Sequence, residues 1–149
     1  MRPPIDFYFD FSSPYSYIAS EWVQAVAARH GRAVQWRAIL LGATFQAAEL
    51  KSPVSYPLKR EYSLRDFVRS ARFAGVPFEM PSKFPIPTQN AARIFWWLHE
   101  TASAEQAVAW AHAKFGSELN LAAVKKLDVA ALKKYVTDQA PASYDRKEA

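Results

Sequence analysis

Residues 6–17 read Asp6-Phe7-Tyr8-Phe9-Asp10-Phe11-Ser12-Ser13-Pro14-Tyr15-Ser16-Tyr17, and this stretch decides the fold. Before the turn, apolar and polar side chains alternate: Ile5, Phe7, Phe9 and Phe11 against Asp6, Tyr8 and Asp10. A period of two predicts a β-strand with one buried face. Ser13 then stands where a helix N-cap belongs, and Pro14 occupies the first helical position. The stretch therefore predicts a buried strand that runs directly into the amino end of a helix.

Ser13 has two interpretations at that turn. A hydroxyl at the amino end of a helix faces free backbone N–H groups and the positive end of the helix dipole, which together favour a bound anion. The pair Ser13-Pro14 also has the form of an ordinary N-cap with no further role. The pattern by itself leaves both interpretations open.

Composition predicts one compact domain over residues 1–149. Half of the residues are hydrophobic and 15% are aromatic, which is enough to build a core at this length. The chain has no cysteine, so disulfide exchange is excluded and a reducing compartment is expected. No apolar run approaches the roughly 20 residues of a membrane span. We expect a soluble, cytoplasmic protein.

The net charge of +5 comes from 19 Lys and Arg against 14 acidic residues. The basic residues are scattered, and the pairs Lys125-Lys126 and Lys133-Lys134 fall on a predicted amphipathic helix, where a solvated face explains them. We therefore expect an anionic small ligand rather than nucleic acid. His30, His99 and His112 are too dispersed to predict a metal site.

The order of elements predicts two portions. A helix from Ser13 to near Arg29 and a strand over 34–40 complete a β-α-β portion, residues 1–42, whose two strands should pair in parallel. Residues 43–149 read as a helical portion, with helices over 57–74, after Thr88, after Ser103 and over 128–136.

The helix over 57–74 has two distinct faces. Its predicted core stripe is Leu64, Phe67, Val68 and Ala71. Lys59, Tyr62, Asp66 and Arg69 share another face, which is typical of an ordinary solvated helix surface with an internal ion pair.

The adjacent residues Trp96 and Trp97 lie on the helix predicted after Thr88 and broaden its apolar face. They are interpreted either as core residues or as a binding platform.

Two patterns carry a family resemblance. The run from Tyr8 to Tyr17 and the spacing Lys59-x-x-Tyr62-x-x-x-Asp66-x-x-Arg69 resemble the 2-hydroxychromene-2-carboxylate isomerases and kappa-class glutathione transferases. These are DsbA-like members of the thioredoxin superfamily. The resemblance implies an α/β, thioredoxin-like fold with a β-α-β start and a mainly helical continuation. It also implies that the closing ββα half of the family is absent from this chain.

The resemblance further implies glutathione as cofactor. In that family the serine equivalent to Ser13 hydrogen-bonds the glutathione sulfur and favours its thiolate. Lys59 would lie near the glutathione pocket, and Phe84 with Pro85 matches a loop that lines the active site. The implied activity is cis–trans isomerisation of a small aromatic carboxylate in the degradation of aromatic compounds.

An alternative is a truncated family member without catalysis, acting as an oligomerising or binding module. Only two strands are readable in the chain, and a parallel pair leaves its edges open. Open edges are completed by a second chain or covered by helices, so we expect a homo-oligomer, a dimer or larger.

Overall fold

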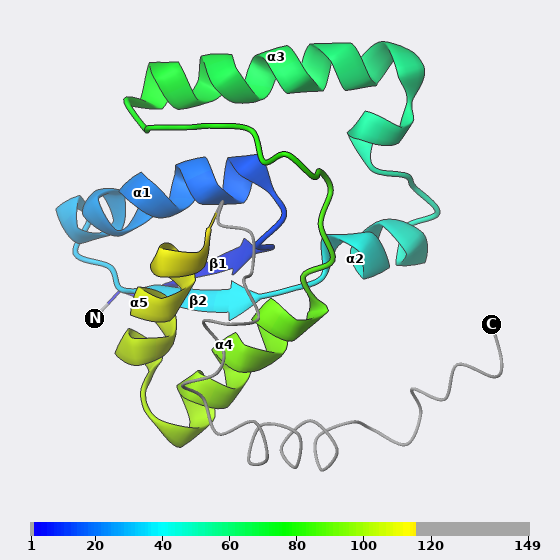
Figure 1. Cartoon of the computed structure of the whole chain (residues 1–149). Helices are drawn as coiled ribbons and strands as arrows, with labels where there is room; N and C mark the ends of the chain where they lie inside the picture. The colour runs from blue at the N-terminus through cyan, green and yellow to red at the C-terminus, as the bar shows by residue number, and fades with distance from the viewer. Residues whose placement is uncertain (1, 116–149) are drawn as a thin grey trace, which may run out of the picture.

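The computed structural model describes residues 2–115 of the chain. The elements follow in the order β1 (Ile5–Phe9), α1 (Pro14–Arg29), β2 (Val34–Ala38), α2 (Leu41–Ala47), the 3₁₀ turn η1 (Pro53–Ser55), α3 (Pro57–Ala74), α4 (Gln89–Thr101) and α5 (Ala104–Lys114). In Figure 1, α1 lies between the two strands and α3, which is the outermost helix, while α4 lies on the opposite side of the strands. The predicted β-α-β start and mainly helical continuation are confirmed.

The two strands pair in parallel, as predicted. Ile5 is opposite Val34 and Phe9 is opposite Ala38, with α1 as the crossover between them. The inward positions of the strands are half-buried or buried, whereas Asp6 and Tyr8 are exposed within the described part of the chain. The period of two in the sequence therefore identified the core face of β1 correctly over Ile5–Phe9.

The core is built mainly of aromatic rings around Phe9, which is completely buried. Its ring centroid lies 5.2–5.5 Å from four others, those of Phe11, Trp36, Phe95 and Phe115. The pairs with Phe11, Trp36 and Phe95 are edge-to-face, a geometry that adds stabilisation beyond the burial of their area. Because these rings come from the turn after β1, from β2, from α4 and from the end of α5, Phe9 connects the strands to the two helices that cover one side of them.

Glycines and a capping serine stand at several helix ends. Gly31 and Gly75 have positive φ angles of 62° and 68°, which place them in the left-handed conformation that commonly terminates a helix. Ser103 accepts a hydrogen bond from the Gln106 amide at 3.2 Å and so caps α5. Trp96 donates from its indole nitrogen to the Ala38 carbonyl at 3.0 Å, which favours the interpretation of this residue as part of the core.

Some expectations about buried faces are wrong. Val68 is 43% exposed, although it was expected in the core stripe of the helix over 57–74, and Trp22 of α1 is 44% exposed. In α1 the buried side chains are instead Pro14, Ile18, Ser20, Val23 and Ala27. The short helices α2 and η1 were not predicted, because a segment of seven residues or fewer has too little periodicity to be recognised. The helix predicted over 128–136 lies outside the described residues.

Candidate functional site

The turn between β1 and α1 is held by Asp10, which is 2% exposed. Its Oδ1 accepts hydrogen bonds from the Ser12 amide at 2.7 Å and from the Ser12 hydroxyl at 2.8 Å. The Ser13 amide donates to the Asp10 carbonyl at 2.9 Å, which closes the turn. These hydrogen bonds fix the turn so that α1 begins beside the carboxyl end of β1.

Asp10 also ties two distant segments to this turn. The Leu41 amide, at the start of α2, donates to Oδ2 at 2.7 Å, and the Thr88 hydroxyl donates to Oδ1 at 2.9 Å. Thr88 was expected to cap α4, but its hydroxyl makes no cap bond and turns to Asp10 instead. A buried carboxylate is costly unless it is fully hydrogen-bonded, so its four donors make Asp10 the organising residue of the site.

Sequence reasoning missed this role of Asp10. The alternating pattern assigned it to the polar, outward-facing set with Asp6 and Tyr8. The strand ends at Phe9, however, so Asp10 belongs to the turn and points inward. The available signal was an aspartate directly before Ser12-Ser13-Pro14, since aspartate commonly bonds the backbone two residues further on.

Ser13 is the N-cap of α1, as predicted. Its backbone is extended, with φ −89° and ψ 113°, and its Oγ accepts from the Ser16 amide at 3.2 Å. Pro14 has no N–H group, and among residues 2–115 no acceptor is found for the Tyr15 amide or for the Ser13 hydroxyl hydrogen. No acidic side chain stands in the first turn of α1. The amino end of α1 therefore offers two hydrogen-bond donors and positive potential.

Phe84 and Pro85 lie in the connection between α3 and α4, joined by a cis peptide bond. The Phe84 ring lies 5.9 Å from that of Phe67 on α3, which in turn lies 5.0 Å from the Tyr15 ring. The hydrogen bond from Thr88 to Asp10 fastens the end of the same connection beside the Ser13 turn. The structure thus brings the loop of Phe84 and Pro85 to the start of α1, with Phe67 between the loop and Tyr15.

Tyr15 joins α1 to α3 through a hydrogen bond of 2.5 Å from its hydroxyl to Asp66. Burial, with a contribution from this bond, raises the pKa of Tyr15 from 10.0 to about 12. The same bond is the main cause that lowers the pKa of Asp66. Asp66 also accepts from Arg69 at 3.0 Å. The charged face predicted on α3 is therefore partly a contact with α1.

Lys59 lies in the first turn of α3 and is exposed, with its ammonium 4.9 Å from the centre of the Tyr56 ring. No described contact joins it to Ser13. Because α3 runs parallel to α1 and meets it at Tyr15, its first turns extend past the amino end of α1, as Figure 1 shows. Seven residues separate Lys59 from Asp66, which is about 10 Å along a helix. Lys59 therefore lies about 10 Å further along α3, towards its amino end, than the residue that bonds Tyr15 of α1.

A family model described as the DSBA-like thioredoxin domain matches residues 4–140. The chain belongs to this family. Within residues 2–115, no helix has the length and apolar character to span a membrane, and no three His, Cys, Asp or Glu side chains are grouped to hold a metal ion.

Its relatives include glutathione S-transferases of the kappa class and 2-hydroxychromene-2-carboxylate isomerases. The chain is 35% identical over 83 residues to glutathione S-transferase kappa 1 of Caenorhabditis elegans, a match covering 55% of this chain and 37% of the relative. It is 29% identical over 115 residues to 2-hydroxychromene-2-carboxylate isomerase of Pseudomonas putida, covering 76% and 54%. A solved structure of 2-hydroxychromene-2-carboxylate isomerase superposes with a TM-score of 0.68 and 25% identity, covering 91% of this chain and 71% of that one. The chain thus spans about half or less of the length of these curated relatives.

Proposed function

We propose that this DSBA-like domain binds glutathione at the amino end of α1 and acts as a glutathione-dependent cis–trans isomerase on a small aromatic carboxylate. The observation that carries the proposal is the unused donor pair at Ser13 and Tyr15, in a helix start without any acidic side chain. A thiolate is an anion, and helix amino ends stabilise anions through their free N–H groups and dipole. The names of the relatives support the same ligand and reaction class.

Each site residue has a distinct role in this proposal. Bound glutathione would supply the thiolate that adds to an unsaturated carbon of the substrate and leaves after bond rotation. Ser13 donates its hydroxyl hydrogen to the sulfur, and the Tyr15 amide adds a second donor beside it. Lys59 attracts the carboxylate of the substrate by its charge. Phe84 and Pro85 form the apolar wall of the site.

The first experiment is calorimetric titration of the chain with reduced glutathione. We expect saturable binding that Ser13→Ala weakens about tenfold or more, the usual effect of losing one hydrogen bond to a charged group. Ser103→Ala is the matched control, because Ser103 caps α5 through the same bond to the third residue of the helix. Binding that is absent in the wild type, or equal in wild type and Ser13→Ala, would contradict the proposed site.

A turnover assay separates binding from chemistry. With a 2-hydroxychromene-2-carboxylate as substrate, we expect isomerisation that depends on added glutathione. We also expect Ser13→Ala to lower kcat because the thiolate is less favoured. Glutathione binding without any turnover would retain the binding site and remove the isomerase assignment.

A second candidate function is a binding module without catalysis. It is favoured by large apolar side chains on the outer side of α3, where Leu58 is 92% exposed and Phe73 is 96% exposed. Such exposure is unusual for a pair of residues on one helix and indicates a contact surface. The absence of both glutathione binding and turnover in the two experiments above would favour this second function.

A further inference from the structure

The connection from α3 to α4, residues 75–88, contains neither a helix nor a strand. It begins at Gly75, directly after α3, and in Figure 1 it passes between α3 and α1 before it descends to α4. We call residues 75–88 the strap. Because no helix or strand ladder holds most of the strap, its position depends on the side chains that anchor it.

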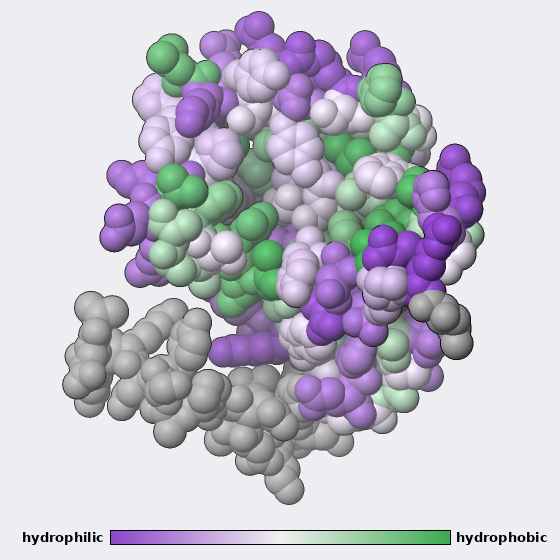
Figure 2. Space-filling model, turned by 180° about the vertical axis from the view of Figure 1, so that it is seen from behind, coloured by the Kyte–Doolittle hydropathy of each residue, from purple (hydrophilic) through white to green (hydrophobic). Residues whose placement is uncertain are grey.

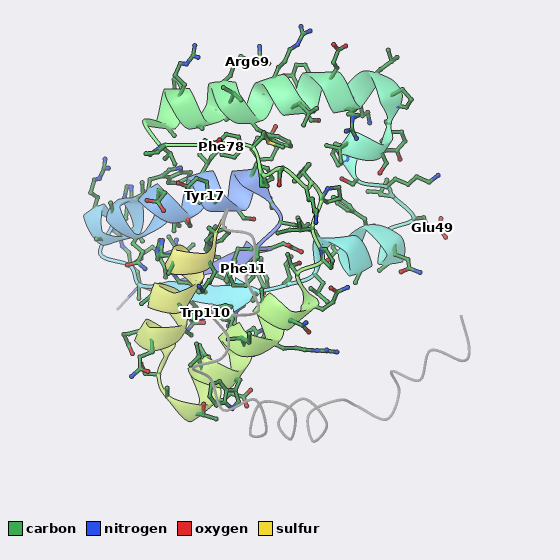
Figure 3. The ribbon with its side chains drawn as sticks, in the orientation of Figure 1. Phe11, Tyr17, Glu49, Arg69, Phe78 and Trp110 are labelled. Carbon is green, nitrogen blue, oxygen red and sulfur yellow. The ribbon has the colours of Figure 1, made fainter. Side chains whose placement is uncertain are left out.

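The first part of the strap is anchored to α1. The Tyr17 hydroxyl donates to the Pro77 carbonyl at 2.7 Å, and the ring centroids of Tyr17 and Phe78 are 6.4 Å apart. Figure 3 shows Phe78 above Tyr17, in the space between α3 and α1. Val76 packs beside them against Ile18 of α1. The strap is therefore fixed to α1 soon after it leaves α3.

The middle of the strap packs on the inner side of α3. The Phe84 ring lies 5.9 Å from the ring of Phe67, which is buried. Figure 2 shows hydrophobic side chains at both ends of the upper edge, along which α3 lies, with hydrophilic side chains between them. Phe67, in the middle of α3, instead points inward, where it meets both Phe84 and the ring of Tyr15 at the start of α1.

The far end of the strap is anchored by Thr88, which is 5% exposed. Thr88 is the N-cap residue of α4, yet its hydroxyl makes no cap bond and donates to Oδ1 of Asp10 at 2.9 Å. The same Oδ1 atom accepts from the amide and the hydroxyl of Ser12, directly before Ser13. One buried carboxylate oxygen therefore bonds both the strap and the turn that carries Ser13.

We propose that Thr88 is a positioning residue that sets the affinity for the aromatic substrate, by holding Phe84 and Pro85 beside the start of α1. The inference rests on the proposed function. Phe84 lies four residues before Thr88, so the two are at most about 14 Å apart along the chain. Loss of the Thr88 hydroxyl releases this short length of chain but leaves both Ser12 bonds to Asp10 in place. The aromatic wall should therefore shift, while the glutathione end of the site is kept.

Steady-state kinetics at saturating glutathione test this role. Thr88→Val keeps the shape of the side chain without its hydroxyl, and it should raise KM for a 2-hydroxychromene-2-carboxylate about five- to tenfold, the size of one lost aromatic contact. The kcat and the calorimetric Kd for glutathione should stay close to their wild-type values. Thr88→Ser restores the hydroxyl and should restore KM. Thr101→Val is the matched control, because the Thr101 hydroxyl bonds the Trp97 carbonyl at the other end of α4.

Trypsin tests the anchor without any ligand or turnover. Lys83 is the single lysine or arginine of the strap, and it is exposed. Cleavage after Lys83 under native conditions should be faster in Thr88→Val than in wild type, because a strap released at one end opens more often. Thr88→Ser and Thr101→Val should be cleaved at the wild-type rate.

The possible failures are distinguishable. A wild-type KM in Thr88→Val, in a chain that does turn over, would remove the positioning role and leave the proposed function intact. A Thr88→Val chain that does not fold, or one that loses glutathione affinity in parallel with substrate affinity, would make Thr88 a support of the whole fold and overturn the inference. A wild-type chain that neither binds glutathione nor turns over would remove the proposed function itself, and this inference with it.

Discussion

Helices α1 and α5 begin with the same local device. The Ser13 and Ser103 side chains each accept a hydrogen bond from the amide three residues further on, both at 3.2 Å. In both cases the capping residue has an extended backbone. Judged by capping alone, the two helix starts are equivalent.

Their first turns differ in charge. Helix α5 carries Glu105, whose pKa is lowered mainly by its own backbone N–H group and then by the Ser103 hydroxyl. Helix α1 has no acidic side chain in its first turn, and Pro14 and Tyr15 occupy the corresponding positions. The amino end of α5 is therefore satisfied by its own carboxylate, whereas that of α1 is open to an external anion. A capping serine indicates where a helix starts. The helix start becomes a candidate anion-binding site only where its first turn carries no acidic side chain.

The largest expected effect is that of removing the Asp10 carboxylate, which supports the start of α1 but not the start of α5. Asp10→Ala should lower the free energy of unfolding by about 3 to 5 kcal/mol, because it leaves buried donors from Ser12, Leu41 and Thr88 without an acceptor. Urea unfolding followed by circular dichroism measures this loss.

Asp6→Ala is the control on the same strand. Asp6 is 44% exposed in its ion pair with Arg37, so its removal should cost far less than that of Asp10. Equal losses for the two variants would show that the bonds to Asp10 do not organise the turn.

Loss of the Ser13 cap and loss of the Ser103 cap should destabilise the fold equally, although only Ser13 is proposed to bind a ligand. Ser13→Ala and Ser103→Ala should each lower the free energy of unfolding by about 1 kcal/mol, the usual cost of losing a side-chain N-cap. Denaturant unfolding without glutathione provides the comparison. A much larger loss for Ser13 would mean that its hydroxyl supports the fold beyond capping, which would weaken its assignment to a ligand.

Tyr15→Phe removes the hydrogen bond from Tyr15 to Asp66, which has no counterpart at the start of α5 among the described residues. The effect of this substitution on the free energy of unfolding should depend on pH. The pKa of Tyr15 is raised from 10.0 to about 12 in the fold. A raised pKa means that its stabilising effect is fully present below the unfolded value and is lost as pH rises through the folded one. The difference in stability between wild type and Tyr15→Phe should therefore be constant up to pH 10 and shrink towards pH 12. A difference that is unchanged over this range would contradict the bond.

The smallest effect is expected for Glu105→Gln, which removes the internal anion of α5. Since the pKa of Glu105 is lowered in the fold, its stabilising effect is present above the unfolded pKa and is lost as pH falls through the folded one. Thermal unfolding of wild type and variant should differ slightly at neutral pH and coincide in acid. A gap that persists in acid would show that the charge of Glu105 is not the cause.

The sequence predicted the elements near Ser13 well and the contacts around them poorly. The alternation at Ile5–Phe9 and the pair Ser13-Pro14 are local signals, and both appear in the structure. Thr88 was expected to cap α4, yet its hydroxyl crosses to Asp10, 78 residues away in the sequence. A threonine hydroxyl can either cap a helix or bond a distant residue, so the residue type at position 88 does not distinguish these two roles.

The sequence by itself therefore determined the β-α-β start, the parallel pairing of its strands and the position of the serine at the helix start. These follow from spacing and from backbone preferences that act over a few residues. Only the tertiary structure decided that Asp10 is buried, that Tyr15 bonds α3, and that Trp22 and Phe73 stay exposed around one groove. Each of these depends on which distant segment packs against the residue, and helical periodicity contains no information about that neighbour.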